Sequence, residues 1–170
     1  MLPLRQRLVT AFIALPGTVT IVIPGIILLA TQGIHLPIVS KPCCAWSVTL
    51  GFSLLAFGLF LALSCMSSFA RVGEGTLAPW DPPKRLVVDG VYRHVRNPMI
   101  SGIFCILFAE ALIARSNALF FWFLLVVTAN CLYIPFFEES SLERRYGQDY
   151  LRYKKNVPRW IPRFKPWSLS

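Results

Sequence analysis

Long apolar runs alternate with short basic segments along this chain. The runs cover roughly Leu8–Ala30, Ala45–Ala70, Met99–Ala114 and Ala118–Phe137. A helix needs about 20 residues to cross the roughly 30 Å of hydrocarbon in a bilayer. The pattern therefore predicts an all-α integral membrane fold with four transmembrane helices, in a single membrane domain over residues 1–170.

The two parts of the chain differ in polarity. Residues 1–70 hold the first two spans, whereas residues 71–170 hold a polar loop, two further spans and a polar tail. Only residues 115–117 separate the third span from the fourth, so we expect a tight antiparallel hairpin there. Pro16 and Pro24 interrupt the first span, where we expect kinks whose freed carbonyls are re-satisfied by neighbouring helices.

Basic residues gather on one side of the predicted spans. Of the 17 Lys and Arg residues, all but Lys41 and Arg115 fall at the N-terminus, in the loop over residues 71–97 or in the tail. The positive-inside rule therefore places both termini and this loop in the cytosol. Because the same topology explains the net charge of +9, we expect no nucleic-acid partner.

The five cysteines show no metal-binding pattern. None belongs to a C-x-x-C pair, and no matching set of His and Cys accompanies them. Cys43 and Cys44 are adjacent in a loop, and neighbouring cysteines rarely bridge each other. We therefore predict neither a metal site nor a disulfide framework.

The polar loop and the tail carry local structural signals. Asp89-Gly90 indicates a turn, and Leu86–Val88 is compatible with a short strand or helix. An apolar-aromatic stripe predicts an amphipathic C-terminal cytosolic helix over residues 136–155; its members, at spacings of 4, 4 and 3, are Leu142, Tyr146, Tyr150 and Tyr153. Such a helix would lie along the interface or pack back over the mouth of the bundle.

Arg96-Asn97-Pro98 stands where the loop enters the third span. Proline suits the first turn of a helix, whose free N–H groups attract an anionic or polar ligand. Arg96 adds a cation with a forked donor set that suits carboxylate or phosphate. The alternative is that Arg96 is one more interfacial anchor.

Glu138 and Glu139 end the fourth span, where the topology does not require acidic residues. Carboxylates are mildly unfavourable at a helix C-terminus. They can accept hydrogen bonds from ribose hydroxyls, attract a cation or act as a base. Alternatively, they pair with Arg144 and Arg145 in the tail.

Two further titratable residues are candidates for a role. Glu110 is the only acid inside a span and precedes Arg115 by five residues, so we expect a structural ion pair between them. His94, in the loop, could titrate near neutral pH and take part directly.

The ordered motifs of loop and tail resemble those of a known family. In chain order they are Leu86-Val87, Gly90, Tyr92, Arg96-Asn97-Pro98, Gly102, Glu138-Glu139, Leu142, Tyr146-Gly147, Tyr150, Tyr153, Val157-Pro158-Arg159 and Ile161-Pro162. They look like the isoprenylcysteine carboxyl methyltransferase family, whose wider group includes phospholipid N-methyltransferases. The resemblance covers about the last 95 residues.

The resemblance implies an integral-membrane enzyme that uses S-adenosylmethionine, releases S-adenosylhomocysteine and lacks a soluble Rossmann domain. Carried over by position, it implies a cytosolic cofactor pocket formed by Leu86, Val87, Tyr92, Asn97, Pro98, Met99, Ile100, Glu138 and Glu139. Arg96 would be an adjacent cation for the methionine carboxylate or an anionic substrate group. Candidate catalytic residues are Arg96, Glu138 and Glu139.

Three departures from the family pattern bear on the acceptor. Asn97 stands where the family commonly has His, and Ile100 stands where it commonly has an aromatic residue. Pro135-Phe136-Phe137 stands where the prenylcysteine enzymes have an Arg before the paired glutamates. We therefore expect a lipophilic small molecule or a membrane lipid as acceptor, without assuming a prenylcysteine. The methylated atom and the oligomeric state stay open.

Two other hypotheses compete with this interpretation. Sterol reductases share a similar C-terminal core and bind NADPH, although those chains are longer and have more spans. A non-catalytic membrane protein or small transporter that keeps the fold would need polar residues along a midplane path, where Glu110 is alone. Binding of adenosyl compounds or of NADPH separates the three hypotheses.

Overall fold

The structure is a computed structural model that describes residues 6–7, 10–11, 13–31, 45–73 and 83–168. Its described part is helical and contains no strand. The elements are η1 (Ile13–Val22), α2 (Ile23–Ala30), α3 (Ala45–Ser68), η2 (Phe69–Gly73), η3 (Gly90–Arg93), α4 (Pro98–Ala114), α5 (Asn117–Tyr133), η4 (Ile134–Glu138), α6 (Glu139–Tyr146) and α7 (Gln148–Asn156).

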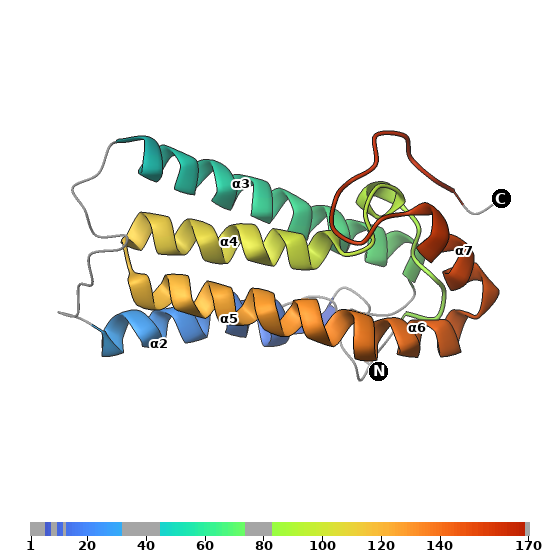
Figure 1. Ribbon diagram of the computed structural model, residues 1–170, viewed down its shortest axis with the longest axis horizontal. Coiled ribbons are helices and arrows are strands. Elements are labelled where there is room, and N and C mark those ends of the chain that lie inside the picture. The colour runs from blue at the N-terminus through green and yellow to red at the C-terminus, as the bar shows by residue number, and fades with distance from the viewer. Residues whose placement is uncertain (1–5, 8–9, 12, 32–44, 74–82, 169–170) are drawn as a thin grey trace.

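Helices α3, α4 and α5 lie side by side along the long axis, and η1 with α2 lies beside α5 (Figure 1). Three helical stretches are long and apolar enough to cross a bilayer: Ile13–Ala30, Trp46–Val72 and Asn117–Tyr146. Helix α4 is apolar but shorter, with 17 residues. These helices confirm the predicted all-α integral membrane fold.

Residues 83–98 and 134–168 gather at one end of the bundle, which we call the motif end (Figure 1). The α4–α5 turn with Arg115 lies at the other end, which we call the hairpin end. Arg115 adopts a left-handed conformation (φ 50°), and the Ser116 side chain accepts a hydrogen bond from Leu119 N. These two residues complete the tight hairpin that the sequence predicts.

The expected ion pair between Glu110 and Arg115 is not formed. Arg115 is exposed at the turn, and Glu110 Oε2 is buried without a hydrogen-bond partner among the described residues. The predicted ion pair assumed that the helix continues through Arg115. It does not form, because α4 ends at Ala114 and Arg115 adopts the left-handed conformation of the turn.

Helices α3 and α4 approach closely because two glycines face each other. A Cβ added to Gly58 would lie 2.7 Å from Gly102 O, and one added to Gly102 would lie 3.0 Å from Gly58 O. Below this crossing, towards the motif end, Cys65 and Phe69 of the α3–η2 stretch pack with Met99 and Ile103 of α4 in the core. This packing therefore fixes the position of the first turns of α4, where the loop motif enters the bundle.

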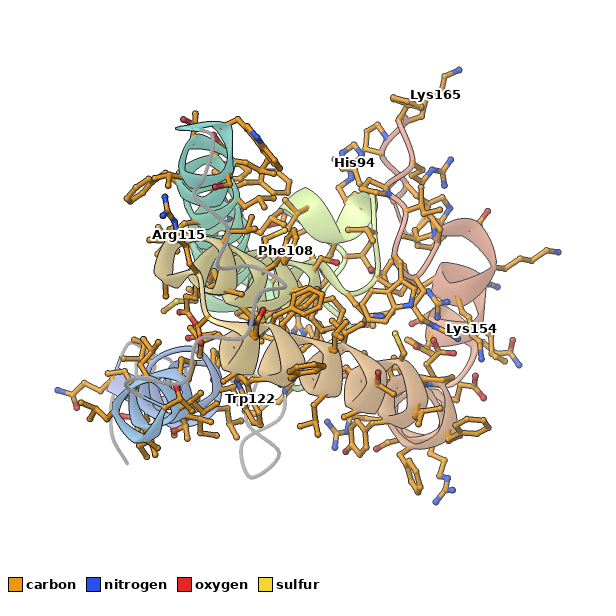
Figure 2. The ribbon with its side chains drawn as sticks, turned by 60° about the vertical axis from the view of Figure 1, so that its left-hand side comes forward. His94, Phe108, Arg115, Trp122, Lys154 and Lys165 are labelled. Carbon is orange, nitrogen blue, oxygen red and sulfur yellow. The ribbon has the colours of Figure 1, made fainter. Side chains whose placement is uncertain are left out.

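The irregular first span is held by a neighbouring helix, as predicted. Pro16 lies within the π-helical η1, and Pro24 follows in the first turn of α2. Pro24 has no N–H to donate to the preceding turn. The Trp122 indole of α5 donates to Val19 O at 3.2 Å instead, and its side chain extends towards η1 (Figure 2).

The predicted C-terminal helix consists of two helices rather than one. Gly147, with φ +54°, separates α6 from α7. The predicted stripe is nevertheless one packed face, because Tyr150 and Tyr153 are buried and Leu142 and Tyr146 pack against them. Leu86 and Val88 join this cluster in an extended segment that is neither strand nor helix. The tail therefore packs back over the loop, which was one of the two alternatives.

Candidate functional site

Tyr92 is anchored in the core beneath the loop. The predicted turn is present, since Gly90 has φ +54° and Tyr92 N donates to Asp89 O at 3.0 Å. It starts η3, which directs Tyr92 edge-on against Phe69, with ring centroids 5.6 Å apart. Burial raises the pKa of Tyr92 well above its ordinary value, and the nearby Glu138 charge adds to the shift. Tyr92 is therefore a protonated packing residue near Glu138.

The tail binds the loop along three backbone hydrogen bonds. Arg96 N donates to Pro158 O at 2.9 Å, Arg163 N donates to His94 O at 2.9 Å, and Trp167 N donates to Arg93 O at 3.0 Å. The Tyr153 hydroxyl adds a buried bond to Tyr92 O at 2.7 Å. Motifs some 60 to 70 residues apart in the sequence are thus joined into one structure at the motif end.

Glu139 is the centre of an ion-pair cluster. Its Oε1 contacts Arg96 Nη1 at 3.0 Å and Arg159 Nε at 2.6 Å, and its Oε2 contacts Lys154 Nζ at 3.1 Å. The side chain is 3% exposed, so these three cations, rather than water, stabilise the negative charge of the carboxylate. Hydrogen bonds to Glu143 and Glu139 raise the pKa of Lys154, and the bond to Glu139 raises the pKa of Arg159. Lys154 and Arg159 therefore stay charged at neutral pH.

Glu138 has a different environment from its neighbour. It is half-buried, and its carboxylate forms no hydrogen bond or ion pair to another described residue. The alternative that the two glutamates pair with Arg144 and Arg145 is wrong for Glu139, whose partners are Arg96, Lys154 and Arg159. Of the two carboxylates, that of Glu138 is the one whose oxygens no described residue uses.

Arg96 also has an unused polar atom. Its side chain is 9% exposed, and Nη1 donates to Glu139 and, at 3.5 Å, to the Tyr150 hydroxyl. Its Nε is buried without a hydrogen-bond partner among the described residues. An unsatisfied buried donor costs about 1–3 kcal/mol, more when charged. Arg96 is therefore a partner of Glu139 that keeps one buried donor, Nε, unused by the described residues.

The other predicted cofactor residues lie at the same end but differ in exposure. Val87, Pro98 and Met99 are buried, whereas Leu86, Asn97 and Ile100 are half-buried. Pro98 is the first residue of α4, as predicted, and Asn97 O accepts from Ser101 N at 3.0 Å. The Asn97 side chain does not cap the helix. The half-buried residues are the better placed to touch a ligand, and the buried ones hold the loop against α3 and α4.

Sequence reasoning missed the residues that neutralise Glu139. Lys154 and Arg159 were seen only as part of a basic tail and of the Val157-Pro158-Arg159 motif. No spacing in the sequence displays these contacts, because it is the break at Gly147 that brings Lys154 within 2.6 Å of Glu143. His94 is not in this cluster, since its Nδ1 is bonded to Arg163 O at 2.8 Å on the other side of η3.

A comparison with protein families matches residues 46–149 to the phospholipid methyltransferase family. The chain belongs to this family. The match begins at α3, earlier than the resemblance of the motifs alone, and it includes Arg96, Glu138 and Glu139. Membership identifies the chain with a group of integral-membrane methyltransferases that also includes the isoprenylcysteine enzymes. Searches among curated proteins and among solved structures found no match.

Proposed function

We propose that this chain transfers the methyl group of S-adenosylmethionine to a lipophilic acceptor at the motif end. The carrying observation is that the Arg96 Nε and the Glu138 carboxylate, both at the motif end, have no hydrogen-bond partner among the described residues. Both come from segments matched to a methyltransferase family. The positive-inside rule supports a cytosolic position for this end.

The residues at the motif end suit an adenosylmethionine in chemical type. Such a molecule carries a carboxylate, an ammonium, a sulfonium and ribose hydroxyls. Arg96 Nε can donate to the carboxylate, and the Glu138 carboxylate can accept from the hydroxyls or the ammonium. When bound, the cofactor would supply an electrophilic methyl group on sulfur.

The remaining residues hold these two groups and limit access of water. The Glu139 cluster fixes Arg96 from one side, and the tail covers the loop through its three backbone bonds. In-line methyl transfer requires positioning and exclusion of water more than covalent assistance. A carboxylate acceptor needs no base at neutral pH, whereas an amine acceptor must lose a proton, for which Glu138 is the available carboxylate.

An apolar surface beside Glu138 suits an acceptor that arrives from the bilayer. Phe136 and Phe137 are 69% and 66% exposed, and Phe137 stacks on Tyr133 with ring centroids 5.6 Å apart. These rings are next to Glu138 in the chain, so a lipid chain against them would bring its polar end near the carboxylate. This placement favours a lipid or another lipophilic molecule as acceptor.

A transfer assay tests the proposal. The full chain is placed in lipid nanodiscs with S-adenosylmethionine carrying a tritiated methyl group, and the products are extracted with organic solvent. We expect tritium in the organic phase, which the Glu138→Gln variant loses and the Asp149→Asn variant keeps, because Asp149 is exposed on α7. Binding of NADPH with no binding of either adenosyl compound would assign the chain to the reductase-like alternative.

A further inference from the structure

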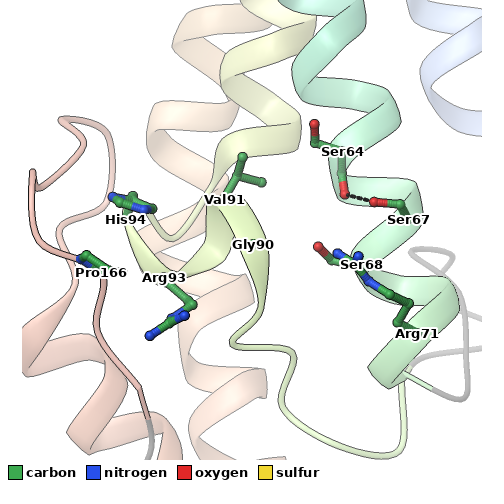
Figure 3. A pocket seen from close by; sticks show the side chains of 9 residues that line it. All are labelled: Ser64, Ser67, Ser68, Arg71, Gly90, Val91, Arg93, His94 and Pro166. Carbon is green, nitrogen blue, oxygen red and sulfur yellow. Dashed lines mark hydrogen bonds between the residues drawn. The ribbon is translucent and has the colours of Figure 1, made fainter.

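An open pocket of about 430 Å³ lies beside the motif loop, and Tyr92 is not among the residues that line it. Its walls are the end of α3, Arg71 of η2, the η3 segment with His94, and Pro166 of the tail (Figure 3). The polar lining residues are Ser64, Ser67, Ser68, Arg71, Arg93 and His94. None of these was singled out as a cofactor residue.

The cavity is cationic and rich in donors. Arg71 and Arg93 come from different elements, and the lining includes no acid. Asp89 contacts Arg71 at 2.9 Å and balances that one charge. Arg93 donates through Nε to Trp167 O at 3.0 Å, which leaves both of its terminal nitrogens without a partner among the described residues. These two nitrogens form a forked donor set of the kind that binds phosphate.

His94 adds a polar atom on the tail side of the cavity. A carbonyl oxygen can only accept, so the 2.8 Å contact with Arg163 O places the hydrogen of His94 on Nδ1. The other ring nitrogen has no hydrogen-bond partner among the described residues. No carboxylate lies opposite it in the lining of the cavity.

The length of α3 places the cavity at the level of lipid headgroups. The stretch Trp46–Val72 has 27 residues, or about 40 Å of helix at 1.5 Å per residue. The hydrocarbon layer is about 30 Å thick, and tryptophan prefers its boundary. With Trp46 at one boundary, the other lies near Cys65, and Ser67 to Arg71 extend among the headgroups.

The tail beside the cavity has the surface of a segment that enters this layer. Ile161 is 79% exposed and Phe164 is fully exposed. Arg163 lies between these two residues, and Lys165 follows Phe164. Lys165 points away from the bundle on the same side as His94 (Figure 2). Apolar side chains interleaved with cations are typical of segments that lie at anionic membrane surfaces.

We propose that this cavity binds the phosphate of an anionic lipid headgroup, with Arg93 and Arg71 as the phosphate ligands and the 161–166 segment in the headgroup layer. It is a second site, because the residues that line it include neither Arg96 nor Glu138, the proposed cofactor contacts. The bilayer depth and the apolar rim favour a lipid over a soluble anion. The proposal does not depend on which acceptor is methylated.

The test is native mass spectrometry of the full chain in detergent, titrated with phosphatidylglycerol or with phosphatidylcholine. We expect phosphatidylglycerol to bind more tightly than phosphatidylcholine. In Arg93→Gln its affinity should fall about tenfold, the size of one lost charge-assisted hydrogen bond. Arg71→Gln should weaken it in the same direction, and this exposed residue can be replaced without harm to the fold. Arg152→Gln removes the same charge from the exposed face of α7 and should leave the affinity unchanged.

Three outcomes would overturn the proposal. The first is equal affinity of the chain for the two lipids, with no effect of Arg71→Gln. The second is binding of inorganic phosphate alone as tight as that of the lipid, which would make the cavity a site for soluble anions. The third is loss of S-adenosylhomocysteine binding in Arg71→Gln and Arg93→Gln, which would merge the cavity with the cofactor site. Failure of methyl transfer alone would leave the lipid result unchanged.

Discussion

Glu138 and Glu139 are neighbours in the sequence but occupy two different regions of the motif end. Glu139 faces the tail, where three cations contact a carboxylate that is 3% exposed. Glu138 lies on the side of Tyr92, with no ion pair to a described residue. The difference separates a residue that holds the tail to the bundle from one whose carboxylate has no described partner and which we propose for the cofactor.

The largest expected effect is that of Glu139→Gln on stability. The amide would leave Arg96 and Arg159 without a counter-charge and Lys154 with Glu143 alone, and loss of one partner of a buried ion pair costs about 3–5 kcal/mol. Chemical unfolding in detergent measures the free energy. Glu143→Gln is the control, because that pair with Lys154 is partly exposed and should contribute less than about 1 kcal/mol. Equal effects of the two substitutions would remove the distinction between the regions.

Glu138→Gln should have the opposite profile. We expect an unchanged free energy of unfolding, because the carboxylate has no described partner to lose. Affinity for S-adenosylhomocysteine should fall tenfold or more, since hydrogen bonds to charged groups contribute about 1.5–3 kcal/mol. Calorimetry on the folded variant measures the affinity. A large loss of stability would show that Glu138, too, is structural.

Arg96→Lys tests the residue that connects the two regions. Lysine keeps the charge beside Glu139 but lacks the planar fork and the Nε donor. We expect an affinity for S-adenosylhomocysteine reduced severalfold, with a stability loss well below that of Glu139→Gln. The informative quantity is the loss of affinity relative to the loss of stability. Unchanged affinity in this variant would show that Nε does not contact the cofactor.

The smallest effect is expected from Tyr153→Phe. The substitution removes the hydroxyl that donates to Tyr92 O at 2.7 Å and keeps the ring in its cluster. One hydrogen bond contributes about 1 kcal/mol, so the midpoint of unfolding should shift slightly. Tyr146→Phe, which loses a bond to Pro83 O further from the site, is the matched comparison. A loss as large as that of Glu139→Gln would mean that this bond, rather than the ion pairs, fastens the tail.

Much of the fold could be predicted because it depends on local pattern. The apolar runs predicted the spans, Asp89-Gly90 predicted the turn before Tyr92, and the stripe through Tyr150 and Tyr153 predicted a packed face. Family membership also followed from motif order. These signals are short-range periodicities or fixed spacings, which a sequence displays directly.

The division of roles within the site could not be predicted. It depends on which cations reach Glu139, and Arg96 does so across 43 residues while Arg159 does so across 20. The break at Gly147 turns Lys154 towards Glu139, whereas the left-handed turn at Arg115 removes the expected partner of Glu110. Pairing of charges requires the fold in three dimensions, so two adjacent glutamates appeared equivalent in the sequence.

Equilibrium dialysis of S-adenosylhomocysteine against the folded full chain tests the central claim most directly. We expect saturable binding by the unaltered chain and by Asp149→Asn, with binding lost or weakened at least tenfold in Glu138→Gln. Absence of binding to the unaltered folded chain would contradict the proposed function. Equal binding by Glu138→Gln would contradict the assignment of the free carboxylate to the cofactor.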